Sequence, residues 1–146
     1  MKRKIPVILL VFVLTLGISF SVAAEVMDGG ALVDELSEEV EREMDAQDLQ
    51  MDLDVGEEYI ILDVRSTAER EEGYIPGSEY VNFGQLFFQI GDLVEDPEQE
   101  FIVACQSGAR SVIAVKLLQD MGYENPINLE GGFMAWEDAG FEVETP

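Results

Sequence analysis

The sequence predicts an α/β protein with a parallel central sheet of about five strands and helices on both faces. Short, continuous apolar runs at residues 59–62 and 101–104 are typical of strands that are buried on both sides. Helical segments alternate with these runs, and this alternation favours a parallel sheet covered on both faces. The chain has 146 residues, of which 47% are hydrophobic, enough to form the core of one domain.

The mature chain is the part that follows the signal peptide predicted for residues 1–24, and its first part is expected to hold one helix. Apolar residues recur at helical spacing between Val33 and Met44, with acids between them, and this predicts an amphipathic helix over residues 31–44. The polar stretch 45–58 is interpreted as a connector. We therefore divide the mature chain into an N-terminal helix with an acidic connector, residues 25–57, and a domain over residues 58–146.

Turn and capping residues mark the next elements. The segment 66–69, Ser-Thr-Ala-Glu, has the pattern of a capping box and opens a short helix that Gly73 ends. A short strand is predicted at residues 80–82. The aromatic-rich segment 83–90 is predicted to be a helix that closes at Gly91.

The last part of the chain repeats the order of strand, loop and helix. The strand at 101–104 leads directly into Cys105, and a helix follows that Gly122 ends. A final short strand is predicted at residues 127–129, followed by a helix that holds Trp136.

The composition excludes several kinds of chemistry. Without histidine, neither a Ser-His-Asp triad nor a Cys-His pair can form, and His-ligated zinc sites are excluded. A single cysteine, Cys105, excludes an internal disulfide and any Cys-x-x-Cys metal or redox pair. Catalysis must rest on Cys105, carboxylates, arginines or backbone groups. We expect no metal and no cofactor.

Residues 1–24 have the three-part order of a secretory signal peptide. Positive charges at positions 2–4 precede an apolar stretch at 5–20, and small residues at 21–24 offer a cleavage site after Ala24. We therefore expect an exported protein, periplasmic or extracellular, without stable membrane contact after cleavage. The alternative is an uncleaved membrane anchor, because the segment is just long enough to span a bilayer.

The chain is strongly acidic. Its formal net charge is −23; without residues 1–24, five positive and 31 negative groups remain, a net charge of −26. Such a surface repels nucleic acids and anionic lipid headgroups, so neither is expected as a partner.

The residues around Cys105 carry the predicted chemistry. Cys105 ends a strand a few residues before a helix begins, where backbone N–H groups can form a cradle for an anion. The helix dipole and Arg110 would favour the thiolate, and Gly108 permits the tight turn that such a loop needs. The alternative is a buried structural cysteine.

Four segments resemble, in order, the motifs of single-domain rhodaneses. They cover about residues 58–142. The segments are Leu62-Asp63-Val64-Arg65, similar to the Asp-Val-Arg motif; Gly73-Tyr74-Ile75-Pro76-Gly77-Ser78, similar to Gly-His-Ile-Pro-Gly-Ala; Cys105-Gln106-Ser107-Gly108-Ala109-Arg110, similar to the Cys-x-x-Gly-x-Arg active loop; and Leu129-Glu130-Gly131-Gly132 with Trp136 and Gly140, similar to the closing Gly-Gly segment.

The resemblance implies sulfur transfer. Cys105 would take a sulfane sulfur from thiosulfate or from a persulfide or polysulfide donor, and would pass it from a persulfide to a thiol or a cyanide-like acceptor. Asp63 and Arg65 would be supporting residues. The residues expected to hold the persulfide are the loop residues Gln106, Ser107, Gly108 and Ala109, with Arg110.

Three positions depart from the family pattern. Tyr74 replaces the usual histidine, Arg70 stands where an aromatic residue usually follows the glutamate, and Gln106 stands where thiosulfate users often have a basic residue. With the net charge, Gln106 indicates a donor other than anionic thiosulfate, such as a persulfide or polysulfide.

Two other functions stay open at this point. A related class of phosphatases and arsenate reductases also uses a Cys…Arg loop, but with five intervening residues, whereas this chain has four. A non-catalytic sulfur carrier or interaction module could dock a partner through Phe83, Phe87 and Phe88, although we expect these aromatic residues in the core.

Overall fold

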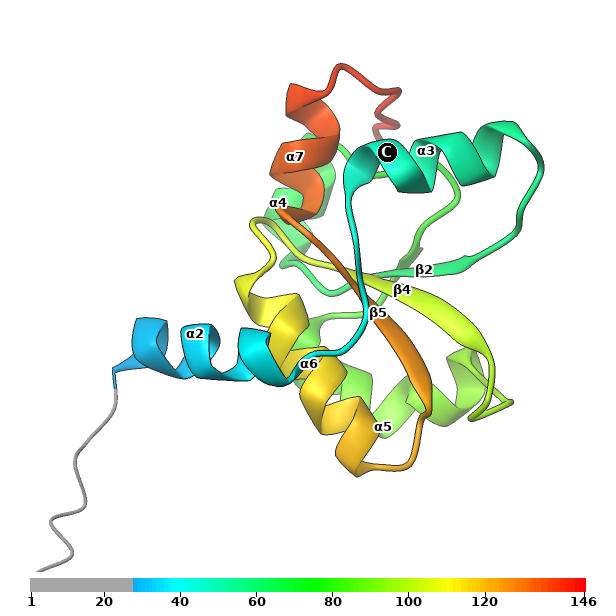
Figure 1. Cartoon of the computed structure of the whole chain (residues 1–146). Coiled ribbons are helices and arrows are strands. Elements are labelled where there is room, and N and C mark those ends of the chain that lie inside the picture. The colour runs from blue at the N-terminus through cyan, green and yellow to red at the C-terminus, as the bar shows by residue number, and fades with distance from the viewer. Residues whose placement is uncertain (1–27) are drawn as a thin grey trace, which may run out of the picture.

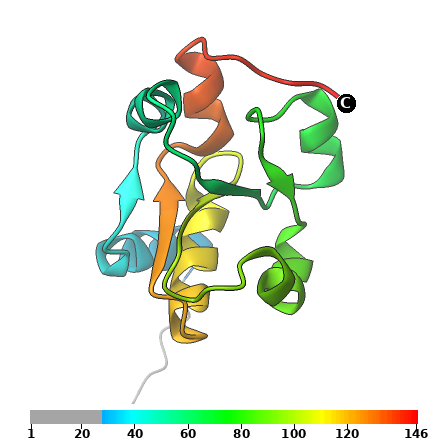
Figure 2. The ribbon, with the colours of Figure 1, turned by 90° about the vertical axis from the view of Figure 1, so that its right-hand side faces the viewer.

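The computed structural model describes residues 28–146 and contains one five-stranded parallel sheet in the order β1-β5-β4-β2-β3 (Figures 1 and 2). The strands are β1 Glu43–Met44, β2 Ile60–Asp63, β3 Glu79–Tyr80, β4 Glu100–Ala104 and β5 Asn125–Leu129. The helices are α2 Gly29–Glu39, α3 Ala46–Asp54, α4 Thr67–Glu72, α5 Phe83–Leu93, α6 Ala109–Asp120 and α7 Gly132–Asp138. The signal peptide predicted at residues 1–24 lies outside the described residues.

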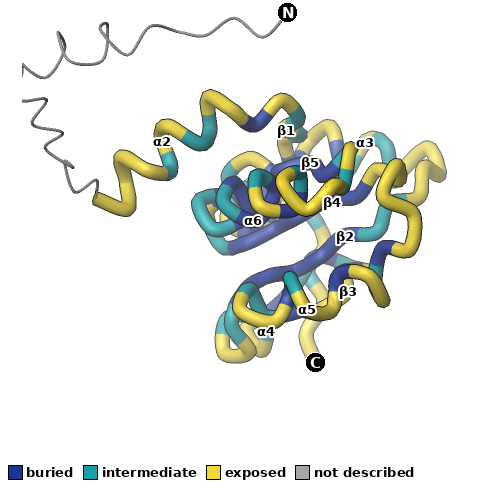
Figure 3. The backbone as a smooth tube through the Cα atoms, turned by 90° about the horizontal axis from the view of Figure 1, so that it is seen from below, coloured by how far each residue is buried: buried dark blue, intermediate teal, exposed yellow. Residues whose placement is uncertain are grey.

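Alternating side chains of the strands build a core on each face of the sheet. Leu62 and Val103 face α2, α5 and α6, and they belong to the first core cluster. Ile61 and Ile102 face the opposite way, toward α3 and α7, in the second cluster. The prediction of a parallel sheet with helices on both faces is confirmed. Figure 3 shows the buried strands at the centre and α2 largely exposed outside them.

The N-terminal helix is shorter than predicted. Instead of continuing over residues 31–44, α2 ends at Glu39, and residues 43–44 form β1 at the edge of the sheet. Val40 is buried in the first core cluster, so the chain turns inward there and pairs with β5.

The predicted connector at residues 45–58 was wrong in one respect, because it contains helix α3. Asp45 caps this helix by accepting a hydrogen bond of 2.8 Å from the backbone N–H of Asp48. Ala46 and Leu49 are buried in the second core cluster. Burial of one helical face outweighs the acidic composition of the segment. β1 and α3 therefore share the sheet and core of the domain.

Most of the other predicted elements are confirmed. The capping box of Ser66 and Glu69 opens α4, and Gly73 ends it. Helix α5 passes through Gly91 and ends at Leu93. Phe83 and Phe87 pack against the first core cluster, as expected. The expectation of a core position was wrong for Phe88, which is 88% exposed. Within residues 28–146, no helix has the length and hydropathy needed to cross a membrane.

Candidate active site

Cys105 follows β4 at the carboxyl end of the sheet, and its side chain is fully buried. The backbone N–H of Gly108 donates a hydrogen bond of 3.1 Å to its Sγ atom. The hydroxyl of Ser111, in the first turn of α6, lies 3.4 Å from the same sulfur and 2.8 Å from the Gly108 carbonyl oxygen. Gly108 has φ +94°, a left-handed conformation that glycine adopts without a steric penalty. The sulfur therefore sits inside the turn that starts α6.

The loop around Cys105 has unused donors. Within the described residues, the backbone N–H groups at positions 106, 107, 109, 110 and 111 donate to no other protein atom. Such donors at a helix N-terminus form a ready site for an anion. Ser107 and Ala109 contribute only their backbone to this cradle.

Helix α7 holds the other side of the loop. The backbone N–H groups of Phe133 and Met134 donate to the carbonyl oxygens of Cys105 and Gln106, at 2.8 and 3.0 Å. These bonds occupy the carbonyl groups of the loop and fix the path of its backbone.

Gly132 makes this close approach possible. It has φ +61°, and a Cβ atom at this position would lie 2.5 Å from the carbonyl oxygen of Cys105. Real Cβ atoms do not come this close to another heavy atom. The Gly-Gly pair at residues 131–132 therefore lets α7 begin directly against the loop.

Arg110 points toward Glu69 of α4. Its guanidinium donates two hydrogen bonds to the carboxylate of Glu69, of 3.0 and 2.5 Å. These bonds, with those from Ser66, lower the pKa of Glu69 from 4.5 to about 2. The same pair raises the pKa of Arg110. Arg110 therefore ties the loop to α4, and its charge is largely balanced.

Asp63 and Arg65 form a buried ion pair next to the loop. Arg65 is 1% exposed, and its guanidinium donates to the carboxylate of Asp63 at 2.9 Å. It also donates to the side-chain oxygen of Gln106 at 3.2 Å and lies 4.0 Å above the ring of Phe133. The pair lies at the carboxyl end of β2, a strand that pairs with both β3 and β4. It links the end of β2 to the active loop and to α7.

Two of the positions that depart from the family pattern lie in one cluster. The guanidinium of Arg70 lies 3.9 Å above the ring of Tyr74 and donates to Asp63 at 2.9 Å. It also binds the side chain and the carbonyl oxygen of Ser78. Arg70 therefore stacks on Tyr74 and shares the Asp63 carboxylate with Arg65.

The comparisons with known proteins agree with this geometry. The family described as "Rhodanese-like domain" matches residues 37–139. The chain belongs to this family. The match includes β1, α3, the cysteine loop and α7. The resemblance found in the motifs is thereby confirmed.

Individual relatives cover most of this rhodanese-like domain. YtwF of Bacillus subtilis is 33% identical over 96 residues, or 66% of this chain and 90% of YtwF. A sulfurtransferase of Allochromatium vinosum is 30% identical over 104 residues, or 71% of this chain and 95% of that protein. A solved structure from Rhodopseudomonas palustris, described as a possible tyrosine phosphatase, matches with a TM-score of 0.74 at 32% identity, and the match covers 82% of this chain and 96% of that one.

Ser111 and Glu69 are the two site residues that the motifs did not indicate. Ser111 directly follows Arg110, and its only signal was a small polar residue among the apolar positions of a buried helix. Glu69 was recognised as a capping residue, but nothing local indicated its bond to a side chain 41 positions away.

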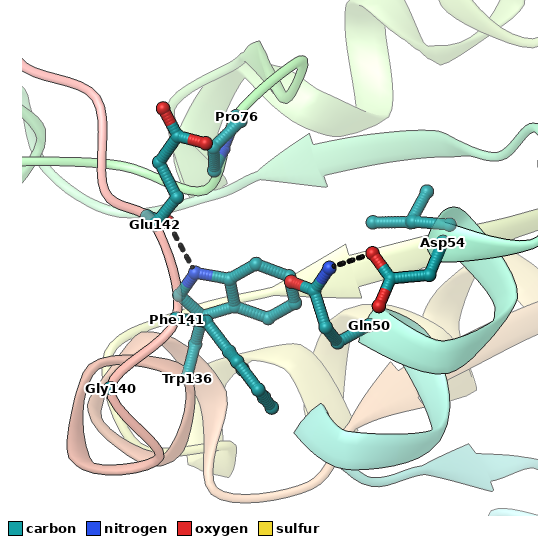
Figure 4. A pocket seen from close by; sticks show the side chains of 8 residues that line it. Gln50, Asp54, Pro76, Trp136, Gly140, Phe141 and Glu142 are labelled. Atoms are coloured by element: carbon teal, nitrogen blue, oxygen red, sulfur yellow. Dashed lines mark hydrogen bonds between the residues drawn. The ribbon is translucent and has the colours of Figure 1, made fainter.

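The groove in Figure 4 lies elsewhere on this rhodanese-like domain. It has a volume of about 470 Å³ and lies between α3 and the segment that follows α7. The indole N–H of Trp136 donates to the Glu142 carbonyl oxygen at 2.8 Å, and Gln50 donates to Asp54 at 2.7 Å. Its lining contains no cysteine and no arginine. The cysteine and the unused backbone donors of the candidate site are therefore found at the Cys105 loop, not in this groove.

Proposed function

We propose that this protein is a sulfurtransferase that carries a sulfane sulfur as a persulfide on Cys105. The observation that carries the proposal is the position of the Cys105 sulfur. It accepts a hydrogen bond of 3.1 Å from the Gly108 N–H and lies in a loop whose other backbone N–H groups are unused. Donors placed in advance around a developing anion stabilise it without reorganisation. The sulfurtransferase relatives support the same activity.

The cycle has two steps. In the first, the Cys105 thiolate attacks the outer sulfur of the donor. A bond forms between Sγ and that sulfur, and the donor's S–S bond breaks with its electron pair on the leaving sulfite or thiolate. In the second step, a thiolate or cyanide attacks the outer sulfur of the persulfide and releases the Cys105 thiolate. Covalent storage on the cysteine divides one transfer into two easier ones.

The loop has the groups that this cycle needs. The Gly108 N–H stabilises the thiolate before the first step and after the second. The single hydroxyl hydrogen of Ser111 is donated to the Gly108 carbonyl oxygen at 2.8 Å and holds the turn in place. The five unused N–H groups of the loop provide donors for the outer sulfur of the persulfide, which carries the negative charge between the steps. Arg65 positions the loop through Gln106.

The pairing of charges favours a donor of low charge. The positive charge of Arg110 is balanced by Glu69, and Arg65 and Arg70 share the single carboxylate of Asp63, so one of the three positive charges is left unbalanced. With Gln106 in the loop and 31 acids in the chain, little free positive charge is left to attract a dianion. We therefore propose a persulfide or polysulfide as the physiological donor and a thiol as the acceptor.

Mass spectrometry of the intact protein tests the proposal. Treatment with a sulfane donor should add about 32 Da, one sulfur atom, to Cys105, and cyanide should then remove it. A Cys105→Ser variant, verified as folded by circular dichroism, should show neither the adduct nor thiosulfate:cyanide activity. Activity in this variant would overturn the proposal. A stable adduct without turnover in the wild type would indicate the carrier role instead of the enzyme.

Phosphate ester hydrolysis is a second candidate, because the structure from R. palustris is described as a possible tyrosine phosphatase. Against it, the loop places four residues between Cys105 and Arg110, and the Arg110 guanidinium is bound by Glu69. Hydrolysis of p-nitrophenyl phosphate that depends on Cys105 would favour this candidate over sulfur transfer.

A further inference from the structure

Two hollows adjoin one another at helix α3. The first is the groove of Figure 4, of about 470 Å³, and the second, of about 500 Å³, lies beside the start of β2. Leu53, in the last turn of α3, and Pro76 line both hollows, so the hollows meet at these two side chains. Together they form one continuous depression, which we call the α3 groove.

The walls of the α3 groove offer apolar surface on both sides of this meeting point. Phe141 lines the first hollow, and Tyr59 and Ile60 line the second. These three side chains, like Leu53 and Pro76, are half-buried, so part of each is open to a ligand. Concave sites with accessible apolar walls favour ligands that bring apolar groups of their own.

The rims of the α3 groove are acidic. Asp54 and Glu142 line the first hollow, Glu57 and Glu58 line the second, and no lysine or arginine lines either one. Figure 4 shows the side chains of Glu142 and Asp54 on either side of the Trp136 ring. All four acidic side chains are exposed, and among residues 28–146 none of them takes part in an ion pair. Their negative charges are therefore available to a partner.

The polar groups of the walls are already bound within the protein. The indole N–H of Trp136 donates to the Glu142 carbonyl oxygen at 2.8 Å, and the hydroxyl of Tyr59 donates to Asp52 at 2.9 Å. The walls therefore present mainly apolar surface, and the carboxylates of the rims can only accept hydrogen bonds. A matching ligand brings apolar groups for the walls and positively charged donors for the rims.

We propose that the α3 groove binds an extended segment of a partner protein in which apolar residues alternate with lysine or arginine. Successive side chains of an extended chain point to opposite sides, so this alternation directs apolar groups to the walls and cations to the rims. Each hollow has its own apolar wall and its own acidic rim, so the groove accommodates two such units in succession. A small amine fills only one of them.

Charge decides between classes of partner. Like charges that face one another across an interface are unfavourable, so the rims exclude an acidic segment and favour a basic one. The combination of apolar walls with acidic rims distinguishes this place from the acidic surface elsewhere, which attracts any cation. No residue of the Cys105 loop lines the groove, so this binding does not depend on the proposed function.

The test uses the full chain and synthetic peptides. Trp136 is the single tryptophan of the sequence and lines the first hollow, so its fluorescence reports on the groove. The protein is titrated with a short peptide of repeated Leu-Lys units, and with Ser-Lys and Leu-Glu peptides of the same length, at fixed ionic strength. The Leu-Lys peptide should bind saturably, and at least about tenfold more tightly than either comparison peptide. Equal binding of the Ser-Lys peptide indicates only a general attraction of cations and would overturn the proposal, as would no binding of the Leu-Lys peptide in calorimetry.

Substitutions then locate the site. Leu53→Lys places a positive charge where the hollows meet and should weaken binding of the Leu-Lys peptide at least about tenfold. The double variant Glu57→Gln/Glu58→Gln should weaken it at least about threefold, since exposed ion pairs are individually weak. Both glutamates are exposed, so this variant keeps the test valid if Leu53→Lys does not fold. The matched control is Glu35→Gln/Glu38→Gln, an equal loss of charge at exposed positions of α2, which should leave the affinity unchanged. Unchanged binding in the Glu57/Glu58 variant, or an equal loss in the control, overturns the proposal.

Discussion

Glu69 of α4 and Arg110 of α6 are joined by two hydrogen bonds of 3.0 and 2.5 Å, although 41 positions separate them in the chain. The same carboxylate accepts from the backbone N–H and the hydroxyl of Ser66, at 2.8 and 2.6 Å, and so caps α4. One side chain therefore both starts a helix and anchors the arginine of the active loop.

This pair makes stability depend on pH. Because the pKa of Glu69 is about 2 in the folded protein and 4.5 ordinarily, its contribution is complete above about pH 4.5 and is lost as pH falls toward 2. Glu69→Gln should lower the free energy of unfolding at pH 7 by roughly 1–2 kcal/mol, since the pair is partly exposed to solvent. The difference from the wild type should shrink between pH 4.5 and 2 in denaturant titrations. A constant difference would contradict the predicted role of the charge.

Gly132→Ala should destabilise the protein and impair sulfur transfer together. The new Cβ atom meets the Cys105 carbonyl oxygen at 2.5 Å and must displace the loop or α7. Gly140→Ala is the matched control: Gly140 has φ +76°, but nothing lies within 4 Å of its Cβ position. In the control variant, the free energy of unfolding should fall only by the cost of a left-handed conformation for alanine, about 1 kcal/mol. If both variants unfold at the same denaturant concentration and stay equally active, the close contact does not matter.

Cys105 should react slowly with external reagents. Its side chain is fully buried, so an alkylating agent reaches the sulfur only when the structure opens. We expect iodoacetamide to modify the native protein at least about 100-fold more slowly than the protein in denaturant. The rate is measured by mass spectrometry. Comparable rates would show that the sulfur is open to solvent, and that a donor needs no movement of the loop.

Cleavage after Ala24 is the prediction for residues 1–24. The charged, apolar and small-residue segments at this end follow the order of a signal peptide. Protein isolated from its native cells should begin at Glu25 in N-terminal sequencing and should appear outside the cytoplasm. Recovery of the intact segment in the membrane fraction would instead favour the anchor.

Local patterns were enough to predict most of the fold and the centre of the site. Buried strands such as β4 appear as continuous apolar runs, and the capping box of α4 is contained in four residues. The turn at Gly108 and the candidate nucleophile Cys105 are likewise neighbours in the chain, so their relation follows from a short motif.

Contacts between distant segments were not visible in the sequence. The helix α3 was missed because its stability comes from burying Ala46 and Leu49 against α7, and its surface is acidic. The two bonds of Arg110 to Glu69 and the stacking of Arg70 on Tyr74 depend on where the sheet places α4. Periodicity predicts which face of a helix is buried, but it does not predict which side chain of another element contacts that face.

The charge of the protein should affect the capture of thiosulfate. A net charge of −26 on the mature chain repels a dianion, and the arginines near Cys105 are paired with Asp63 and Glu69. Salt screens this repulsion, because the Debye length falls from about 10 Å at 0.1 M to about 3 Å at 1 M. We expect kcat/KM for thiosulfate to rise with ionic strength, the reverse of an enzyme that attracts its substrate. Salt also weakens the local attraction of the loop, but the N–H donors lie next to the sulfur and are screened less.

The control is a neutral sulfane donor, whose kcat/KM should stay constant over the same range. A flat or falling curve for thiosulfate would mean that the acidic surface lies too far from the loop to influence capture.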